Sequence, residues 1–153
     1  MTHAWRVVKA KYARSAFDGE GARRSGGRFN SRGTAVVYAA DSLALALLEV
    51  AVHLPSYHGL RGRVAFRLRI PDDLVETLAE DDLPADWRAT PPARSAQLLG
   101  DAWVAEARSP VLRVPSVVVP HAHNLVLNPE HADLGRIEID DPEPVPIAPR
   151  PVK

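Results

Sequence analysis

The fold is decided by the stretch Gly26-Gly27-Arg28-Phe29-Asn30 and the apolar segments that follow it, Val36-Val37-Tyr38 and residues 42–54. One arginine, one tyrosine and one glutamate stand there among residues of core type: Arg28, Tyr38 and Glu49. We interpret these three side chains as the centre of a ligand pocket whose walls are built by the rest of the chain.

The segment from Ser42 to Leu54 is predicted to be a helix. Ser42 is a favourable N-cap and Pro55 ends the helical pattern. Leu, Ala and Val occupy every face, so we expect this helix to be buried most of the way round. Burial would raise the pKa of Glu49 unless a cation or a donor compensates. His53, four residues on, or a nearby arginine could satisfy the carboxylate structurally, so the helix alone leaves both interpretations open.

Composition is that of a globular chain. The 153 residues are 46% hydrophobic and 25% charged, which fits a single domain over residues 1–153. Cysteine is absent, as suits a reducing cytoplasm. The first residues lack the apolar core of a signal peptide, and no run is long enough to cross a membrane. The proline-rich tail from Asp140 is expected to be extended along the surface.

Charge is unevenly distributed along the chain. Residues 1–70 hold 12 Lys/Arg against 4 Asp/Glu, and residues 71–153 hold 7 against 15. The two halves could neutralise each other, or a basic N-terminal wall could meet an anionic ligand. Nucleic acid is a weaker candidate, because no stacking aromatic series or helix-turn-helix pattern accompanies the basic residues.

Short strands and one further helix are predicted around this centre. Alternation predicts a first strand at residues 4–10, with Arg6 on the same face as Val8, although a surface-directed arginine is the commoner outcome. The remaining strands are expected at residues 36–40, 61–70 with solvated arginines, 74–78, 110–120 near a sheet edge, and 136–139. Residues 93–107 are predicted to form an amphipathic helix interrupted by Gly100, with Trp103 in the core.

Residues 13–34 are expected to be a long Gly- and Arg-rich loop, and such loops are usually functional. The segment Gly19-Glu20-Gly21 has Arg24 where a dinucleotide-binding fingerprint needs its third glycine, and no Gly-Lys-Ser/Thr follows. Its arginines and backbone amides could instead bind phosphates directly.

Two other chemistries are disfavoured by the sequence. His121, His123 and His131 have the spacing of only a weak metal site, so no metal is expected. Ser116 is not surrounded by the Gly-x-Ser-x-Gly pattern of a serine hydrolase.

An ordered set of motifs resembles the RES-domain family, the toxin half of bacterial RES–Xre toxin–antitoxin pairs. The motifs are Trp5-Arg6, Gly26-Gly27-Arg28-Phe29-Asn30, Val37-Tyr38, Leu48-Glu49-Val50, Leu83-Pro84, Trp87, Val114-Pro115-Ser116, Asn124, and Asn128-Pro129 with His131. The resemblance runs from Trp5 to about Asp140, with Phe29 where many members have Trp.

The resemblance implies an α+β fold of mixed small sheets with helices around a cleft, related to ADP-ribosyltransferases of the diphtheria-toxin type. It implies an enzyme that consumes NAD+ by cleaving the nicotinamide–ribose bond, and a cognate Xre-type antitoxin that occludes the cleft. Arg28, Tyr38, Glu49 and Ser116 fall on the family's active-site positions, and Arg6 and Asn124 on ligand-contacting ones. The sequence leaves the oligomeric state undecided, with a homodimer as one possibility.

The chemistry fits these residue types. Cleavage builds positive charge on the ribose, which a fixed carboxylate at Glu49 would stabilise. The Arg28 fork suits pyrophosphate oxygens, and the Tyr38 ring could stack on nicotinamide. Three functions stay open: NAD+ hydrolysis or phosphorolysis, protein ADP-ribosylation from the same pocket, and a non-catalytic binding module.

Overall fold

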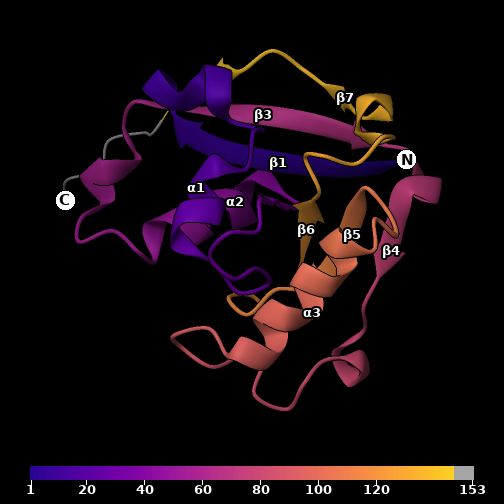
Figure 1. Cartoon of the computed structure of the whole chain (residues 1–153). Helices are drawn as coiled ribbons and strands as arrows, with labels where there is room; N and C mark the ends of the chain where they lie inside the picture. The colour runs from indigo at the N-terminus through magenta and orange to yellow at the C-terminus, as the bar shows by residue number, and fades with distance from the viewer. Residues whose placement is uncertain (147–153) are drawn as a thin grey trace.

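The computed structural model describes residues 1–146 (Figure 1). The strands in chain order are β1 (Thr2–Lys9), β2 (Val37–Ala40), β3 (Arg63–Ile70), β4 (Val75–Thr77), β5 (Val111–Pro115), β6 (His123–Leu127), β7 (Glu138–Ile139) and β8 (Glu143–Pro144). The helices are α1 (Glu20–Ser25), α2 (Leu43–Ala51) and α3 (Arg94–Ala105). Short 3-10 turns are η1 (Ala10–Ser15), η2 (Tyr57–Leu60), η3 (Asp72–Leu74), η4 (Glu80–Asp82) and η5 (Leu134–Arg136).

The strands form one curled sheet in the order β4-β5-β6-β2-β1-β3-β7, with β8 also paired to β3. All pairs are antiparallel except β4 with β5, so the sheet is mixed. The α+β class is confirmed, but the several small sheets expected from the resemblance are continuous with one another. In Figure 1, β1 and β3 run across the direction of β4, β5 and β6.

The two halves of the sheet meet at a single residue pair. β1 pairs with β3 over its whole length, from Thr2 opposite Ile70 to Lys9 opposite Arg63. Between β1 and β2, however, the register contains only Trp5 opposite Ala40. The two central strands therefore diverge beyond this pair, and the opening between them becomes part of the candidate site.

Three apolar clusters hold these elements together. One lies on the face of β1 and β3 that carries Ala4, Val8 and Phe66. A second lies between α3 and β5, where Trp103 is fully buried as predicted. The third joins α2 to β1 and β2 through Leu45 and Ala46.

Helix α2 begins as predicted but is more exposed than predicted. The Ser42 hydroxyl accepts a hydrogen bond from the Leu45 N–H at 3.0 Å, which confirms the N-cap. Leu48 and Val52 are 42% and 54% exposed, so the expectation of burial on nearly every face is wrong. Because α2 packs on the sheet along one side only, its other faces border solvent or the cavity described below.

The segment 13–34 is also more regular than predicted. It contains the end of η1 and the whole of α1, where Glu20 forms ion pairs with Arg23 at 2.5 Å and Arg24 at 3.0 Å. These two arginines are therefore occupied by a carboxylate.

Helix α3 is continuous through Gly100, where an interruption was predicted. A Cβ at Gly100 would lie 1.7 Å from the Phe29 carbonyl oxygen, so the glycine lets the 26–30 segment pack directly against the helix. Gly100 thus allows the close approach of the 26–30 segment, and the helix continues through it.

The β5 strand ends at Pro115, earlier than the predicted 110–120, and β4 covers one of its edges. After β7, residues 143–144 return to β3, so this part of the tail predicted from Asp140 is paired. The rest of that prediction, from residue 147 on, lies outside the described residues.

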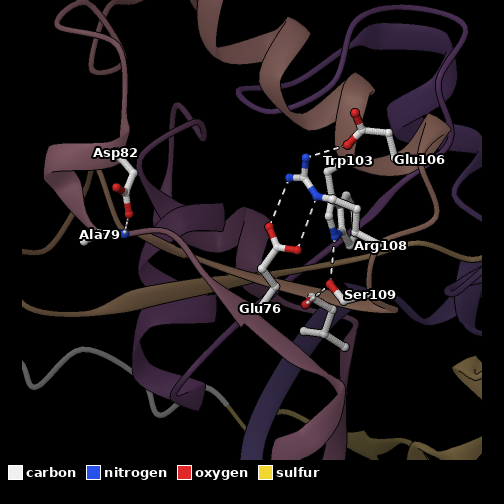
Figure 2. Close-up of polar contacts among 8 residues, drawn as sticks. Glu76, Ala79, Asp82, Trp103, Glu106, Arg108 and Ser109 are labelled. Atoms are coloured by element: carbon white, nitrogen blue, oxygen red, sulfur yellow. Dashed lines mark hydrogen bonds and ion pairs between the residues drawn. The ribbon is translucent and has the colours of Figure 1, made fainter.

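Polar contacts fasten the β4–α3 side of the molecule (Figure 2). Arg108 donates to Glu76 at the β4 strand and to Glu106 after α3, and the Trp103 indole donates to the Ser109 hydroxyl at 2.9 Å. Asp82 accepts from the Ala79 N–H within the preceding turn. None of these residues lines the cavity. The contacts of Arg108 and Trp103 join β4 and the segment before β5 to the end of α3.

Candidate active site

A cavity of about 660 Å³ opens where β1 and β2 diverge. Its walls come from β1, the 26–29 segment with Ala22, β2, α2 and the residues just after it, the start of β3, residues 90–92, the turn after β5 and Asn124 of β6. Ligand pockets for molecules of drug or cofactor size span roughly 300–1,000 Å³. The charged side chains lining it are three arginines and one carboxylate: Arg6, Arg28, Arg63 and Glu49.

Arg6 fills the opening between the two central strands. Its Nε donates to the Ala16 carbonyl at 2.6 Å and its Nη1 to the Tyr38 carbonyl at 2.8 Å. Burial lowers the pKa of Arg6, and the charge of Asp18 partly offsets this. The alternative of a surface-directed arginine is wrong, because the guanidinium is anchored inside and lines the cavity.

Arg28 lies on another wall and is held in the same way. Its Nη1 donates to the Trp87 and Ala89 carbonyls, both at 2.8 Å. The residue is half-buried, and this desolvation lowers its pKa. Because these acceptors are neutral, the positive charge stays uncompensated toward the cavity.

Tyr38 is fixed by its hydroxyl. The phenol donates to the Asn30 Oδ1 at 2.6 Å and accepts from the Phe29 N–H at 3.0 Å. Burial raises the pKa of Tyr38 above its usual range, so the phenol stays protonated. With its oxygen engaged by protein groups, the part of Tyr38 offered to a ligand is the ring.

Two residues shape the 26–30 segment around Tyr38, and the sequence did not single them out individually. A Cβ at Gly27 would lie 2.7 Å from the Tyr38 hydroxyl, so only glycine fits there without displacement. Asn30 is fully buried, and its amide donates to the Ala22 and Thr34 carbonyls. This network places Arg28 at the cavity wall.

Glu49 faces the cavity from α2 and is bound by Asn124 of β6. The Asn124 Nδ2 donates to the Glu49 Oε1 at 2.7 Å and to the Ala39 carbonyl at 3.2 Å. Burial raises the pKa of Glu49, the Asn124 hydrogen bond lowers it, and the charge of Asp41 raises it. The carboxylate is therefore satisfied by an amide, whereas the sequence suggested His53 or an arginine as the structural partner.

Ser116 was predicted as a site residue but does not line the cavity. Its buried hydroxyl accepts from the Val118 and Val119 N–H groups, both at 3.1 Å. These bonds shape the turn after β5, which presents Val117 and Val118 to the cavity. The structure thus places Ser116 behind the wall.

Of the three histidines considered for a metal, two have contacts or positions that can be described. His131 accepts from the Asp133 N–H at 3.0 Å and contacts the Ala107 carbonyl, while His123 belongs to β6. Within residues 1–146 no group of three potential ligands is placed to hold a metal ion.

Arg63 was missed, because alternation in 61–70 suggested a solvated face. It is half-buried and lines the cavity, and its Nε donates to the Gly59 carbonyl at 3.0 Å. The sequence held no signal that set Arg63 apart from the other arginines of this segment.

The uneven charge is only slightly neutralised between the two halves of the chain. Within the described residues, Arg69 with Glu138 and Asp140 is the side-chain ion pair between an arginine of residues 1–70 and an acid of the remainder. The other acids with arginine partners after residue 70 are paired within their own half. Among the described residues, none of the cavity arginines has a carboxylate at ion-pairing distance.

The fold and the cavity define a class: a small α+β protein with a pocket that is lined by guanidinium groups and one carboxylate. The RES domain model matches residues 3–148, and the chain belongs to the RES-domain toxin family.

Relatives support this membership over most of their length. A protein named "Toxin Res" from Photorhabdus laumondii is 37% identical over 86% of this chain and 85% of its own. A "Prs ADP-ribosylating toxin" from a Sphingobium species is 39% identical over 90% of this chain and 88% of its own. The fold is similar to a chain in the crystal structure of the M. tuberculosis MbcT–MbcA toxin–antitoxin complex, with a TM-score of 0.76 and 21% identity over 94% of this chain and 83% of that chain.

Proposed function

We propose that this protein is the toxin of a toxin–antitoxin pair and that it consumes NAD+ by cleaving the bond between nicotinamide and ribose. The observation that carries the proposal is one cavity in which a half-buried glutamate lies together with arginines that, within residues 1–146, have no carboxylate at ion-pairing distance. A dinucleotide pyrophosphate supplies the missing anion, and a developing ribosyl cation matches the carboxylate.

Glu49 is the proposed catalytic residue. Departure of neutral nicotinamide leaves an oxocarbenium-like ribose, whose positive charge a fixed carboxylate stabilises more than it stabilises the substrate. Asn124 occupies one carboxylate oxygen, which leaves Oε2 for the sugar. NAD+ enters this account as substrate, and no metal is required.

Arg28 and Arg6 are the proposed pyrophosphate ligands. Each guanidinium is oriented by two backbone carbonyls and retains further N–H donors for phosphate oxygens. The Tyr38 ring is proposed to stack on nicotinamide or the adjoining ribose. Ser116 is proposed to act as a positioning residue through the 116–119 turn.

A second candidate is transfer of the ADP-ribose to a protein side chain. It is favoured by the name of the Sphingobium relative, and it needs the same pocket with a different acceptor. The structural relation to ADP-ribosyltransferases of the diphtheria-toxin type, which the resemblance implies, stays a prediction.

The proposed partner is an Xre-type antitoxin that occludes the cavity. Support comes from the structural neighbour, which was solved as a toxin–antitoxin complex.

No helix among residues 1–146 is long and apolar enough to cross a membrane.

Product analysis tests these proposals. The full chain is incubated with NAD+, with and without phosphate and with a cell extract as protein acceptor, and products are identified by mass spectrometry. Free ADP-ribose indicates hydrolysis, phosphorylated ADP-ribose indicates phosphorolysis, and labelled protein indicates transfer. Intact NAD+ in all three mixtures would contradict the enzyme and leave a binding module.

A further inference from the structure

The cavity holds one more arginine than the proposed function uses. Arg63 begins β3, lies on a different wall from Arg28, and is oriented by the Gly59 carbonyl of η2. A Cβ at Gly59 would lie 2.9 Å from Leu54 Cδ1, so this glycine lets η2 close onto a residue that also lines the cavity. One guanidinium N–H is thus oriented by a backbone carbonyl of this turn.

A comparison of the charged groups of the cavity with those of NAD+ leaves Arg63 without a counterpart on the ligand. The cavity is lined by three arginines and one glutamate. In NAD+ the cationic nicotinamide would face Glu49, and the two phosphates would face Arg6 and Arg28. Within the described residues Arg63 has no carboxylate at ion-pairing distance. A half-buried cation is stabilised when an anion binds beside it.

We propose that Arg63 forms a second phosphate subsite, which takes a phosphate dianion in addition to the dinucleotide pyrophosphate. His53 of the segment after α2 lines the same cavity and supplies a further hydrogen-bonding group. The dianion comes either from a third phosphate carried on the nucleotide, as in NADP+, or from free orthophosphate bound together with NAD+. The assignment of the pyrophosphate to Arg6 and Arg28 rests on the proposed function.

Binding measurements distinguish the two sources. In a Glu49→Gln background, which slows consumption of the ligand, calorimetry compares NAD+, NADP+ and orthophosphate. For a carried phosphate, Arg63→Ala lowers the preference for NADP+ over NAD+ by roughly tenfold to a hundredfold, the effect of losing a charge-assisted hydrogen-bonded pair. For free phosphate, the same loss appears in the orthophosphate affinity.

Arg61→Ala is the matched control. Arg61 is exposed, lies two residues earlier and does not line the cavity, so its removal deletes the same charge without touching the subsite. Arg63→Lys keeps the positive charge but loses the planar guanidinium that can donate two parallel hydrogen bonds. We therefore expect a loss of phosphate affinity between those of the parent and of Arg63→Ala. If Arg63→Ala does not fold, Arg63→Lys against Arg61→Lys decides.

An NADP+ preference and an orthophosphate affinity that both stay within twofold of the parent would overturn the subsite. Failure of the proposed function is recognised separately, because the product analysis of the wild-type chain would then leave NAD+ intact. Orthophosphate titration of the Arg63 variants would still decide the subsite in that case.

Discussion

At the residue scale, Glu49 is the group on which the proposed chemistry depends. It is half-buried, accepts one amide hydrogen bond, and faces the cavity. Glu49→Gln preserves the shape and the acceptor for Asn124 but removes the charge. We expect NAD+ consumption to fall by about 10²–10³-fold, the size of losing one electrostatic stabiliser. Purified protein and a nicotinamide-release assay measure this, and an unchanged rate would exclude Glu49.

The same substitution has the opposite sign for stability. Burial raises the pKa of Glu49 in the folded chain above its unfolded value, so the folded state binds this proton more tightly. The ionised carboxylate therefore reduces stability at pH values above the folded pKa, and the penalty disappears as the pH falls through it. We expect Glu49→Gln to unfold at equal or higher urea concentration than wild type at pH 7.5, with the gap closing near pH 4.

Asn124 sets the ionisation of Glu49. Its hydrogen bond favours the charged carboxylate, so Asn124→Ala should raise the pKa of Glu49 further, and Asn124→Asp should raise it most through like charge. The acid limb of the pH–rate profile is expected to move to higher pH in that order. Superimposable acid limbs in the three proteins would show that Asn124 acts on something other than this carboxylate.

Sequence reasoning reached the residues of the cavity unevenly. Arg6, Arg28, Tyr38, Glu49 and Asn124 all line it. A polar side chain in an apolar segment is visible in a sequence, and the family motifs added Asn124. Ser116 stands out equally in its segment, yet its hydroxyl is used by local backbone N–H groups. Whether such a hydroxyl turns to a ligand or to its own turn depends on backbone geometry that the sequence does not encode locally.

At the element scale, α3 supports the site through a glycine. The Phe29 carbonyl occupies the space of a Cβ at Gly100, and Phe29 directly follows Arg28. The local sequence pattern predicted a helix interruption at this glycine. It could not show the tight contact, because that contact is made with a segment about seventy residues earlier in the chain. The over-prediction of burial for α2 has a similar origin, since an apolar surface of a helix can equally face a cavity or solvent.

Gly100→Ala should couple helix packing to ligand binding. The new methyl group cannot be accommodated without moving the Phe29 backbone, so we expect a loss of several kcal/mol in unfolding free energy or a displaced Arg28 wall with at least tenfold weaker NAD+ binding. Urea denaturation and calorimetry measure the two effects.

Gly21→Ala is the control for that substitution. A Cβ there meets nothing within 4 Å, and the residue lies inside α1, so alanine should stabilise by roughly 0.5–1 kcal/mol. Equal behaviour of the two alanine variants would contradict the packing role of Gly100.

At the scale of the whole molecule, the cavity exists because the sheet is almost divided between β1 and β2, which share a single residue pair. The strands themselves were predictable from alternation, but their order was not, since the pairing of β1 with both β2 and β3 joins residues far apart in sequence. The single pair of Trp5 with Ala40 and the abrupt divergence after it leave no local pattern. In place of ladder hydrogen bonds, the Arg6 guanidinium bridges the opening to the Tyr38 carbonyl.

Arg6→Ala should therefore weaken both the joint between the sheet halves and the site. Two part-buried carbonyls, of Ala16 and Tyr38, lose their donor, which costs about 1–3 kcal/mol each where water does not replace it. We expect lower stability, faster hydrogen exchange in β2 and the second half of β1, and weaker NAD+ binding.

Arg28→Ala separates these contributions, because Arg28 lines the same cavity but bonds to the carbonyls of Trp87 and Ala89, away from the joint. It should weaken NAD+ binding comparably while leaving exchange in β1 and β2 near wild type. If both variants change exchange at β1 and β2 equally, the bridge across the opening is not made by Arg6 alone. If neither does, the Trp5–Ala40 pair and the surrounding core suffice to hold the halves together, and Arg6 belongs to the ligand site only.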